Sequence, residues 1–239
     1  MKSRLIPLIL IGILAVVLLG LGIVKGNLFT VKDIVIESQT VTDDDIDAIL
    51  EIVGINYSDS MLSIDSEKAC EVLGLSGTYS CDAITLVYPS TVKIHVEKRI
   101  PHAVVESEHV FILIDNECNV ISTAQSYDDY NLPTFTGVRI AQYSYGTCLE
   151  TKDPYQKNLM LSIMETLYSQ STVGLVSVVS LEDPSNMYII TSTGKKLQLN
   201  EAADVAAKLS HLATDELQEL IFSDEEFTIT LYKNSFVIS

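Results

Sequence analysis

Three histidines, His95, His102 and His109, recur at intervals of seven residues. On a helix this interval would place the imidazoles on one face, where they could bind a metal ion or transfer a proton. The residues around them instead alternate between apolar and polar, which is typical of β-strands. We therefore expect His95 to lie on the polar face of a strand, in contact with solvent, and predict no catalytic site from these histidines.

Two groups of carboxylates are further candidates for metal binding or acid–base chemistry. Three successive aspartates follow Thr42 at a predicted helix start, where acidic side chains suit the helix dipole and a capping box. Asp115 and Glu117 lie in a predicted turn, where such side chains commonly accept backbone hydrogen bonds. We interpret both groups as local capping residues and predict no metal site.

The chain lacks the short motifs of the common enzyme classes. It contains no G-x-S-x-G nucleophile elbow, no H-E-x-x-H metal motif, no P-loop and no G-x-G-x-x-G. Tryptophan is absent, which disfavours an aromatic platform for sugars. We therefore predict that the protein is not an enzyme and needs no cofactor.

The four cysteines are Cys70, Cys81, Cys118 and Cys148. No C-x-x-C pair or neighbouring histidine pair gives them the spacing of a zinc site. If all four are oxidised, three pairings are open. Cys70 and Cys81 are the candidate pair for one disulfide.

Residues 5–24 form a long stretch without charge. At about 1.5 Å per residue, a helix of this length would cross the apolar core of a membrane. A cleaved signal peptide is the alternative, but its apolar core is shorter, roughly 7–15 residues. A lipoprotein is disfavoured because the first cysteine is Cys70. We predict an uncleaved transmembrane helix.

The charges around this stretch predict its orientation. Lys2 and Arg4 precede it, and no acidic residue occurs before Asp33. We therefore expect a cytoplasmic tail of residues 1–4 and an extracytoplasmic remainder, the type II single-pass topology of a cell-membrane protein. That remainder holds all 32 acidic residues of a chain with net charge −17. Such a surface disfavours binding to nucleic acids or to anionic lipids.

Residues 27–98 predict a small α+β domain with the order strand, helix, helix, strand, strand. The first helix starts after Thr42 and ends at Gly54, and the second starts after Asp65. The last two strands form a hairpin in which apolar and polar residues alternate. The apolar positions of its second strand are Val92, Ile94 and Val96.

This order of elements resembles the POTRA domain of the bacterial cell division proteins FtsQ and DivIB. Three segments carry the resemblance: Phe29-Thr-Val31-Lys-Asp-Ile34, Met61-Leu62-Ser-Ile64-Asp65, and Tyr88-Pro89-Ser-Thr91-Val92-Lys-Ile94-His-Val96-Glu-Lys98-Arg99-Ile-Pro101. In the family the last motif typically ends in Glu-Arg-x-Pro. Lys98 stands here in the Glu position, with Glu97 beside it, whereas Arg99 and Pro101 match.

Residues 99–239 predict a second, β-rich domain with helices, which resembles the β domain of the same family by pattern. Cys118 replaces the glycine of a family Ile-Asp-x-x-Gly-x-Val hairpin, so a turn position that needs positive φ would be strained. Leu132-Pro133-x-Phe135-x-Gly137 matches a family Leu-Pro-x-x-x-Gly segment. Asp153 and Pro154 predict a helix to about residue 170, and a last helix is expected over about residues 201–212.

The expected fold is therefore α+β, with an N-terminal transmembrane helix at residues 5–24, a POTRA-like domain at 27–98 and a β domain at 99–239. The resemblance implies a non-enzymatic divisome scaffold at the division septum. Such a membrane-embedded scaffold would bind the bitopic coiled-coil proteins FtsB/DivIC and FtsL and help to regulate the septal peptidoglycan synthase. Two alternatives are an exported, membrane-anchored adhesin or sensor without a division role, and an anchored hydrolase.

The C-terminal residues are the candidate partner-binding site. A terminal strand leaves unpaired N–H and C=O groups, and this one carries a single lysine, Lys233, and no proline to block them. A partner strand could then extend the sheet, and in FtsQ-like proteins the corresponding end docks the coiled-coil partner. The alternative is an edge covered by the domain's own loops. The candidate residues are Phe227, Thr228, Ile229, Thr230, Leu231, Tyr232, Phe236 and Val237.

Overall fold

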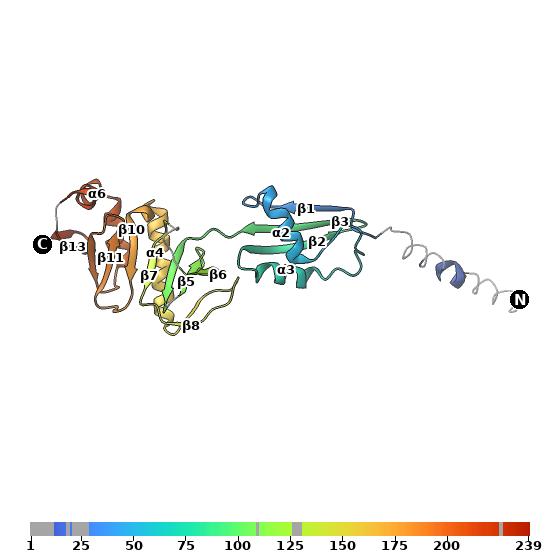
Figure 1. Cartoon of the computed structure of the whole chain (residues 1–239), viewed down its shortest axis with the longest axis horizontal. Coiled ribbons are helices and arrows are strands. Elements are labelled where there is room, and N and C mark those ends of the chain that lie inside the picture. The colour runs from blue at the N-terminus through green and yellow to red at the C-terminus, as the bar shows by residue number, and fades with distance from the viewer. Residues whose placement is uncertain (1–11, 18–19, 21–28, 109, 126–130, 225–226) are drawn as a thin grey trace, which may run out of the picture. The chain divides into compact units, whose positions relative to one another are not determined.

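The computed structural model describes residues 12–17, 20, 29–108, 110–125, 131–224 and 227–239. The chain divides into two compact units (Figure 1). The first comprises Met1–Gly74 and Tyr79–Lys98, and the second comprises Leu75–Thr78 and Arg99–Ser239.

The first unit contains two helices and a three-stranded sheet. Its elements follow the order β1 (Asp33–Glu37), α2 (Asp43–Val53), α3 (Ser66–Gly74), β2 (Tyr79–Val87) and β3 (Thr91–Lys98). β3 lies in the middle of the sheet, parallel to β1 and antiparallel to β2. This is the order of strand, helix, helix, strand and strand that the sequence predicts.

The core of the first unit lies between the sheet and its helices. Along β3, Val92, Ile94 and Val96 are almost fully buried, whereas the residues between them are partly exposed. α3 packs against β2, and α2 packs against α3. The period of two in the sequence therefore marks the buried face of the central strand.

The second unit is built on a larger sheet. Its described strands have the order β14-β13-β12-β11-β10-β7-β4-β5-β6. Their bounds are β4 (Ala103–Ser107), β5 (Val110–Ile114), β6 (Val120–Ala124), β7 (Thr134–Thr136), β10 (Val176–Ser180), β11 (Met187–Thr191), β12 (Lys196–Asn200), β13 (Ile229–Leu231) and β14 (Phe236–Ile238). A separate pair of short strands is formed by β8 (Ile140–Gln142) and β9 (Glu150–Thr151).

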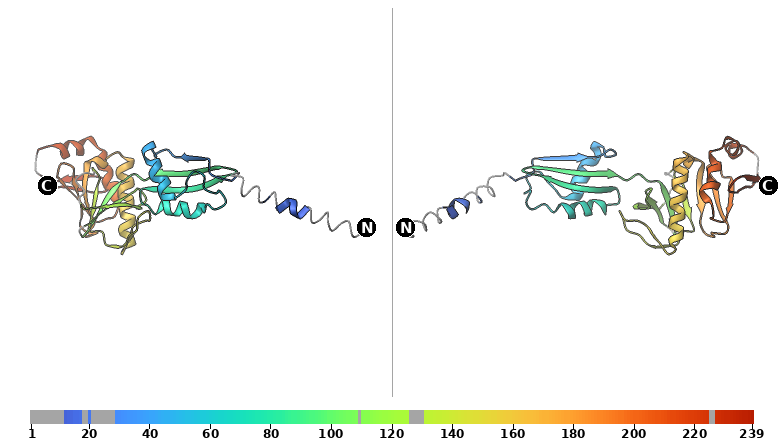
Figure 2. Two further views of the ribbon diagram at one scale, coloured as in Figure 1. Left: turned by 45° about the vertical axis from the view of Figure 1, so that its right-hand side comes forward. Right: turned by 180° about the vertical axis from the view of Figure 1, so that it is seen from behind.

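The helices of the second unit cover its core. Figure 2 shows α4 (Pro154–Ser169) beside the strands of the large sheet, and its residues Leu159, Ile163 and Leu167 join one apolar cluster with residues from those strands. Asp153 caps α4 by accepting a hydrogen bond from the Tyr155 N–H at 3.0 Å, as the Asp-Pro pair predicts.

The helical region near the C-terminus differs from the sequence expectation. Instead of one helix over about residues 201–212, the structure has α5 (Val205–Leu209), the 3-10 turn η3 (Ser210–Ala213) and a further helix, α6 (Asp215–Phe222). A further 3-10 turn, η2 (Val173–Leu175), precedes β10. Leu217 and Ile221, four residues apart, are the buried residues of α6, so the sequence did contain the helical spacing that would have predicted this helix.

The expected transmembrane helix requires correction. Within the described part of the chain, no helix is long and apolar enough to cross a membrane. The structure describes only residues 12–17 and 20 of the stretch 5–24, and the helical run 12–17 is far shorter than the roughly 20 residues that a bilayer requires. The rest of that stretch and the expected tail of residues 1–4 lie outside the described residues. The fold class becomes α+β, with no spanning helix in the described residues.

Candidate partner-binding edge

A β-hairpin forms one end of the large sheet. β13 pairs in parallel with β12 and antiparallel with β14. The Tyr232 N–H donates to the Ser235 carbonyl at 2.8 Å and closes the turn between the two strands. β14 is therefore the outer strand, and β13 lies inside the sheet.

This pairing corrects the expected position of the open edge. Thr230 lies between Gln198 of β12 and Val237 of β14, and its neighbours Ile229 and Leu231 are fully buried. The chain turns back after Leu231, so a strand that looks terminal in the sequence is covered on both sides.

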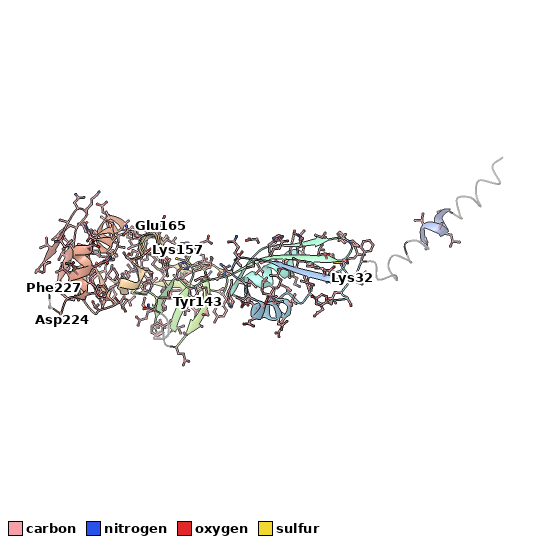
Figure 3. All side chains as sticks on the ribbon, turned by 90° about the horizontal axis from the view of Figure 1, so that it is seen from above. Lys32, Tyr143, Lys157, Glu165, Asp224 and Phe227 are labelled. Carbon is pink, nitrogen blue, oxygen red and sulfur yellow. A yellow bond between two sulfur atoms is a disulfide. The ribbon has the colours of Figure 1, made fainter. Side chains whose placement is uncertain are left out.

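The other candidate residues divide between the two strands and the connections beside them. Phe227 and Thr228 directly precede β13, and Phe227, labelled in Figure 3, packs partly buried against the core of the second unit. Phe236 lies opposite Leu231. Ile238 of the outer strand was not among the candidates, although it continues the alternation that begins at Phe236.

The backbone of β14 offers hydrogen-bonding groups along its outer side. Thr228 and Ser239 exchange two backbone hydrogen bonds of 2.9 Å. Because bonded and non-bonded pairs alternate in antiparallel strands, Val237 also turns its N–H and C=O toward β13. Phe236 and Ile238 turn theirs to the opposite side, where no other described strand pairs with β14.

Apolar side chains surround this open edge. Val237 is 51% exposed, Ile238 47% and Tyr232 48%. Exposed apolar side chains beside unpaired backbone groups are the features that strand addition uses, since the backbone supplies affinity and the side chains supply selectivity.

Contacts from α5 and η3 hold the hairpin in place. His211 of η3 lies with Nε2 3.0 Å from the Tyr232 carbonyl, and its ring lies 6.1 Å from that of Phe236. Lys233 in the turn forms an ion pair of 3.1 Å with Asp204. The hairpin with the outer strand β14 is thus held by these side-chain contacts as well as by the pairing of β14 with β13.

The opposite edge of the sheet is partly covered. At the start of β6, the Val120 N–H donates to the Thr147 carbonyl at 2.9 Å, and the Gly146 N–H donates to the Val120 carbonyl at 2.8 Å. The segment 143–149 therefore lies along the start of β6, in contrast to the outer side of β14.

The carboxylates Asp115 and Glu117 do not form a catalytic pair. Asp115 is buried, forms an ion pair of 2.8 Å with Arg99, and accepts hydrogen bonds from the Glu117 and Asn119 N–H groups. Cys118 completes this turn with a φ of 64°, the positive value expected at the position of the family glycine. Asp115 thus fixes a turn, and Arg99 neutralises its charge.

Asp45 and Lys98 form the main polar contact inside the first unit. Lys98 Nζ lies 2.6 Å from Asp45 Oδ1, and the same carboxylate accepts hydrogen bonds from Thr42 and Tyr79. Lys98 and then Thr42 hold the pKa of Asp45 well below its ordinary value. Burial, together with the bond to Asp45, raises the pKa of Tyr79 to about 12. Lys98 therefore pairs with the capping aspartate of α2.

Glu97 binds the loop between β1 and α2. It accepts hydrogen bonds from the Thr40 hydroxyl at 2.6 Å, from the Gln39 N–H at 3.0 Å and from the Ser38 hydroxyl at 3.0 Å. The Thr40 hydroxyl and the Gln39 N–H lower the pKa of Glu97. The Glu97 carboxylate therefore has a structural role, because it holds the loop between β1 and α2.

His95 and His102 have different contact partners. His95 Nδ1 lies 3.2 Å from Glu37 on the surface of the first unit. The centre of the His102 ring lies 4.5 Å from that of Tyr168 in the second unit, and the two rings are tilted by 49°. His109 lies outside the described residues. Within the described ranges, no group of three or more His, Cys, Asp or Glu side chains is arranged to hold a metal ion.

Two of the four cysteines are bonded. Cys70 and Cys81 form a disulfide with a Cα–Cα distance of 5.4 Å, which links α3 to β2. Cys118 and Cys148 are free thiols, the first buried and the second partly exposed.

The chain is similar to a solved structure of a bacterial protein. No protein-family model matches the chain, and no curated protein matches it. Among solved structures, the chain is similar to the major extracytoplasmic domain of the trans isomer of the bacterial cell division protein DivIB from Geobacillus stearothermophilus. The identity is 13% and the TM-score 0.33, over 50% of this chain and 96% of that chain.

Proposed function

We propose that this protein is a non-enzymatic scaffold of bacterial cell division, of the FtsQ/DivIB type, acting at the division septum. Its partners would be bitopic coiled-coil proteins related to FtsB/DivIC and FtsL, and through them it would help to regulate septal peptidoglycan synthesis. The observation that carries the proposal is the open outer side of β14, where Phe236 and Ile238 present backbone groups among exposed apolar side chains.

The three family-like segments of the first unit support the proposal because they meet in space. The Met61 N–H donates to the Phe29 carbonyl at 2.8 Å, and the Phe29 ring lies 5.9 Å from that of Tyr88, edge to face. Met61 is fully buried. Residues that are far apart in the sequence thus belong to one packed end of the first unit, so the motif spacing has a structural cause.

The proposed binding mode is strand addition to β14. A partner segment in an extended conformation would bond to the N–H and C=O groups of Phe236 and Ile238. The side chains of the partner segment on the core side of the sheet would contact Ile238. The Ile238 side chain is half exposed, although it lies opposite the buried Ile229. The partner would therefore carry apolar residues at alternate positions.

A proline at Ile238 tests this mode directly. Proline removes an N–H that points away from the sheet, and an edge strand tolerates it there. We expect Ile238→Pro to weaken capture of DivIC/FtsB-like and FtsL-like proteins by the full chain roughly tenfold or more. Ile238→Val is the matched control, because it keeps both the N–H and an apolar side chain. Equal capture by the proline variant and the wild type would exclude docking at β14.

Depletion of the protein separates the division role from the alternative of an adhesin or sensor. Filamentation or failed septa supports the scaffold. Normal division with loss of surface binding would contradict it and favour the alternative.

A further inference from the structure

The two free thiols lie on neighbouring segments of the second unit. Cys118 ends the turn between β5 and β6 and is fully buried in the apolar core. Cys148 precedes β9 and packs, partly buried, against the same core. Both residues therefore pack with one apolar core, although they are thirty positions apart in the sequence.

Backbone contacts place these segments side by side. The Leu149 N–H donates to the Cys118 carbonyl at 2.8 Å, and Asn119 and Cys148 form an antiparallel bridge. Cys148 Sγ lies 3.5 Å from the Glu117 carbonyl. Cys148 Sγ therefore lies beside the peptide bond that joins Glu117 to Cys118. The positive φ of Cys118, 64°, takes this residue out of the regular alternation of side chains along a strand.

The two thiols interact electrostatically and have different surroundings. Burial raises the pKa of Cys118 to about 12, and the nearby Cys148 adds to the increase. Lys157 of α4, labelled in Figure 3, donates to Cys148 Sγ at 3.6 Å. The ammonium can stabilise the negative charge on Cys148 when this sulfur attacks a disulfide.

We propose that Cys118 and Cys148 form a second, reversible disulfide that fixes the segment 143–149 along strand β6. The Cys70–Cys81 pair is bonded in the structure, whereas Cys118 and Cys148 are free. The inference is independent of the proposed role in division.

The reaction requires an oxidised disulfide, such as glutathione disulfide. Cys148 attacks one sulfur of it, the S–S bond breaks, and the first glutathione leaves with the proton that Cys148 gives up. Cys118 then transfers its proton to a departing thiolate and attacks Cys148 Sγ, which releases the second glutathione. Two protein thiols are oxidised and one glutathione disulfide is reduced to two thiols. The second step should be the slower one, because Cys118 is buried and holds its proton firmly.

The proposed Cys118–Cys148 bond would affect the edge of the large sheet at β6. The segment 143–149 bonds to Val120 through Gly146 and Thr147, and Cys148 lies within it. A disulfide to Cys118 would keep these hydrogen bonds formed. In the reduced form, no covalent bond holds the segment 143–149 against β6. Oxidation should therefore slow hydrogen exchange of the Val120 N–H.

Trypsin digestion without reduction identifies the new bond. Cleavage after Arg99, Arg139 and Lys152 separates Cys118, in peptide 100–139, from Cys148, in peptide 140–152. Cys70 and Cys81 fall in one peptide, 69–93, so their bond cannot be mistaken for it. We expect the full chain, equilibrated with glutathione disulfide and alkylated, to yield a linked species of 100–139 and 140–152.

Two variants test the assigned roles. Cys148→Ser should abolish the linked species and leave Cys118 as a free thiol. Lys157→Met, which keeps the aliphatic stem, should slow the linkage severalfold without changing its final amount. The proposal is overturned if Cys148 accumulates as a glutathione adduct beside a free Cys118. It is also overturned if both thiols persist under conditions that keep Cys70–Cys81 oxidised, or if Lys157→Met leaves the rate unchanged.

Discussion

Lys98 Nζ lies 2.6 Å from Oδ1 of Asp45, and Asp45 is a buried residue at the first turn of α2. The pair joins the end of the central strand β3 to the start of this helix. Lys98 therefore places a positive charge beside the buried carboxylate of Asp45 and forms an ion pair within the first unit.

Acid should weaken the first unit through Asp45. Its pKa is lowered in the folded state, so its contribution to stability is complete above the ordinary aspartate pKa and is lost as the pH falls below about 4. The unfolding midpoints of the wild type and Asp45→Asn should therefore differ at neutral pH and converge on acidification. Asp43→Asn, an exposed change in the same helical turn, should show no such convergence. A pH-independent difference for Asp45→Asn would contradict this assignment.

Local patterns predicted the first unit well because its elements are defined by neighbouring residues. Thr42 and Gly54 bound α2, and the alternation around Ile94 describes β3. The C-terminal edge could not be predicted in the same way. Whether β13 or β14 lies outside depends on β12, which is distant in the sequence and pairs with β13 in parallel.

The opposite faces of β3 should respond differently to substitution. Ile94 is fully buried, so Ile94→Asp places an unpaired carboxylate in the core and should unfold the first unit. His95→Ala removes only a surface contact with Glu37 and should cost about 0–1 kcal/mol. Thermal unfolding of the full chain, followed by circular dichroism, measures both. Similar midpoints for the two variants would show that the register of the strand is wrong.

Neighbouring prolines in β14 should separate folding from binding. The Val237 N–H points toward Thr230, so Val237→Pro should break the hairpin and cost about 1–3 kcal/mol of stability. Ile238→Pro removes an outward N–H and should leave the stability of the second unit nearly unchanged. Denaturant titration of both variants is the measurement. A larger loss for Ile238→Pro than for Val237→Pro would mean that the outer side of β14 has been assigned to the wrong residues.

Gly137 should tolerate no side chain in the second unit. It has a φ of 73°, and a Cβ there would lie 2.5 Å from the Glu182 nitrogen and 2.6 Å from its Cα. Backbone atoms cannot move away without disturbing the end of β10, so Gly137→Ala should cost about 2–4 kcal/mol. A Cβ at Gly174 would meet no atom within 4 Å, and Gly174→Ala should stay within about 0.5 kcal/mol of the wild type. Denaturant unfolding compares the stability of the two alanine variants. Equal stability would show that the family-like Leu-Pro-x-x-x-Gly segment does not need glycine where its backbone approaches Glu182.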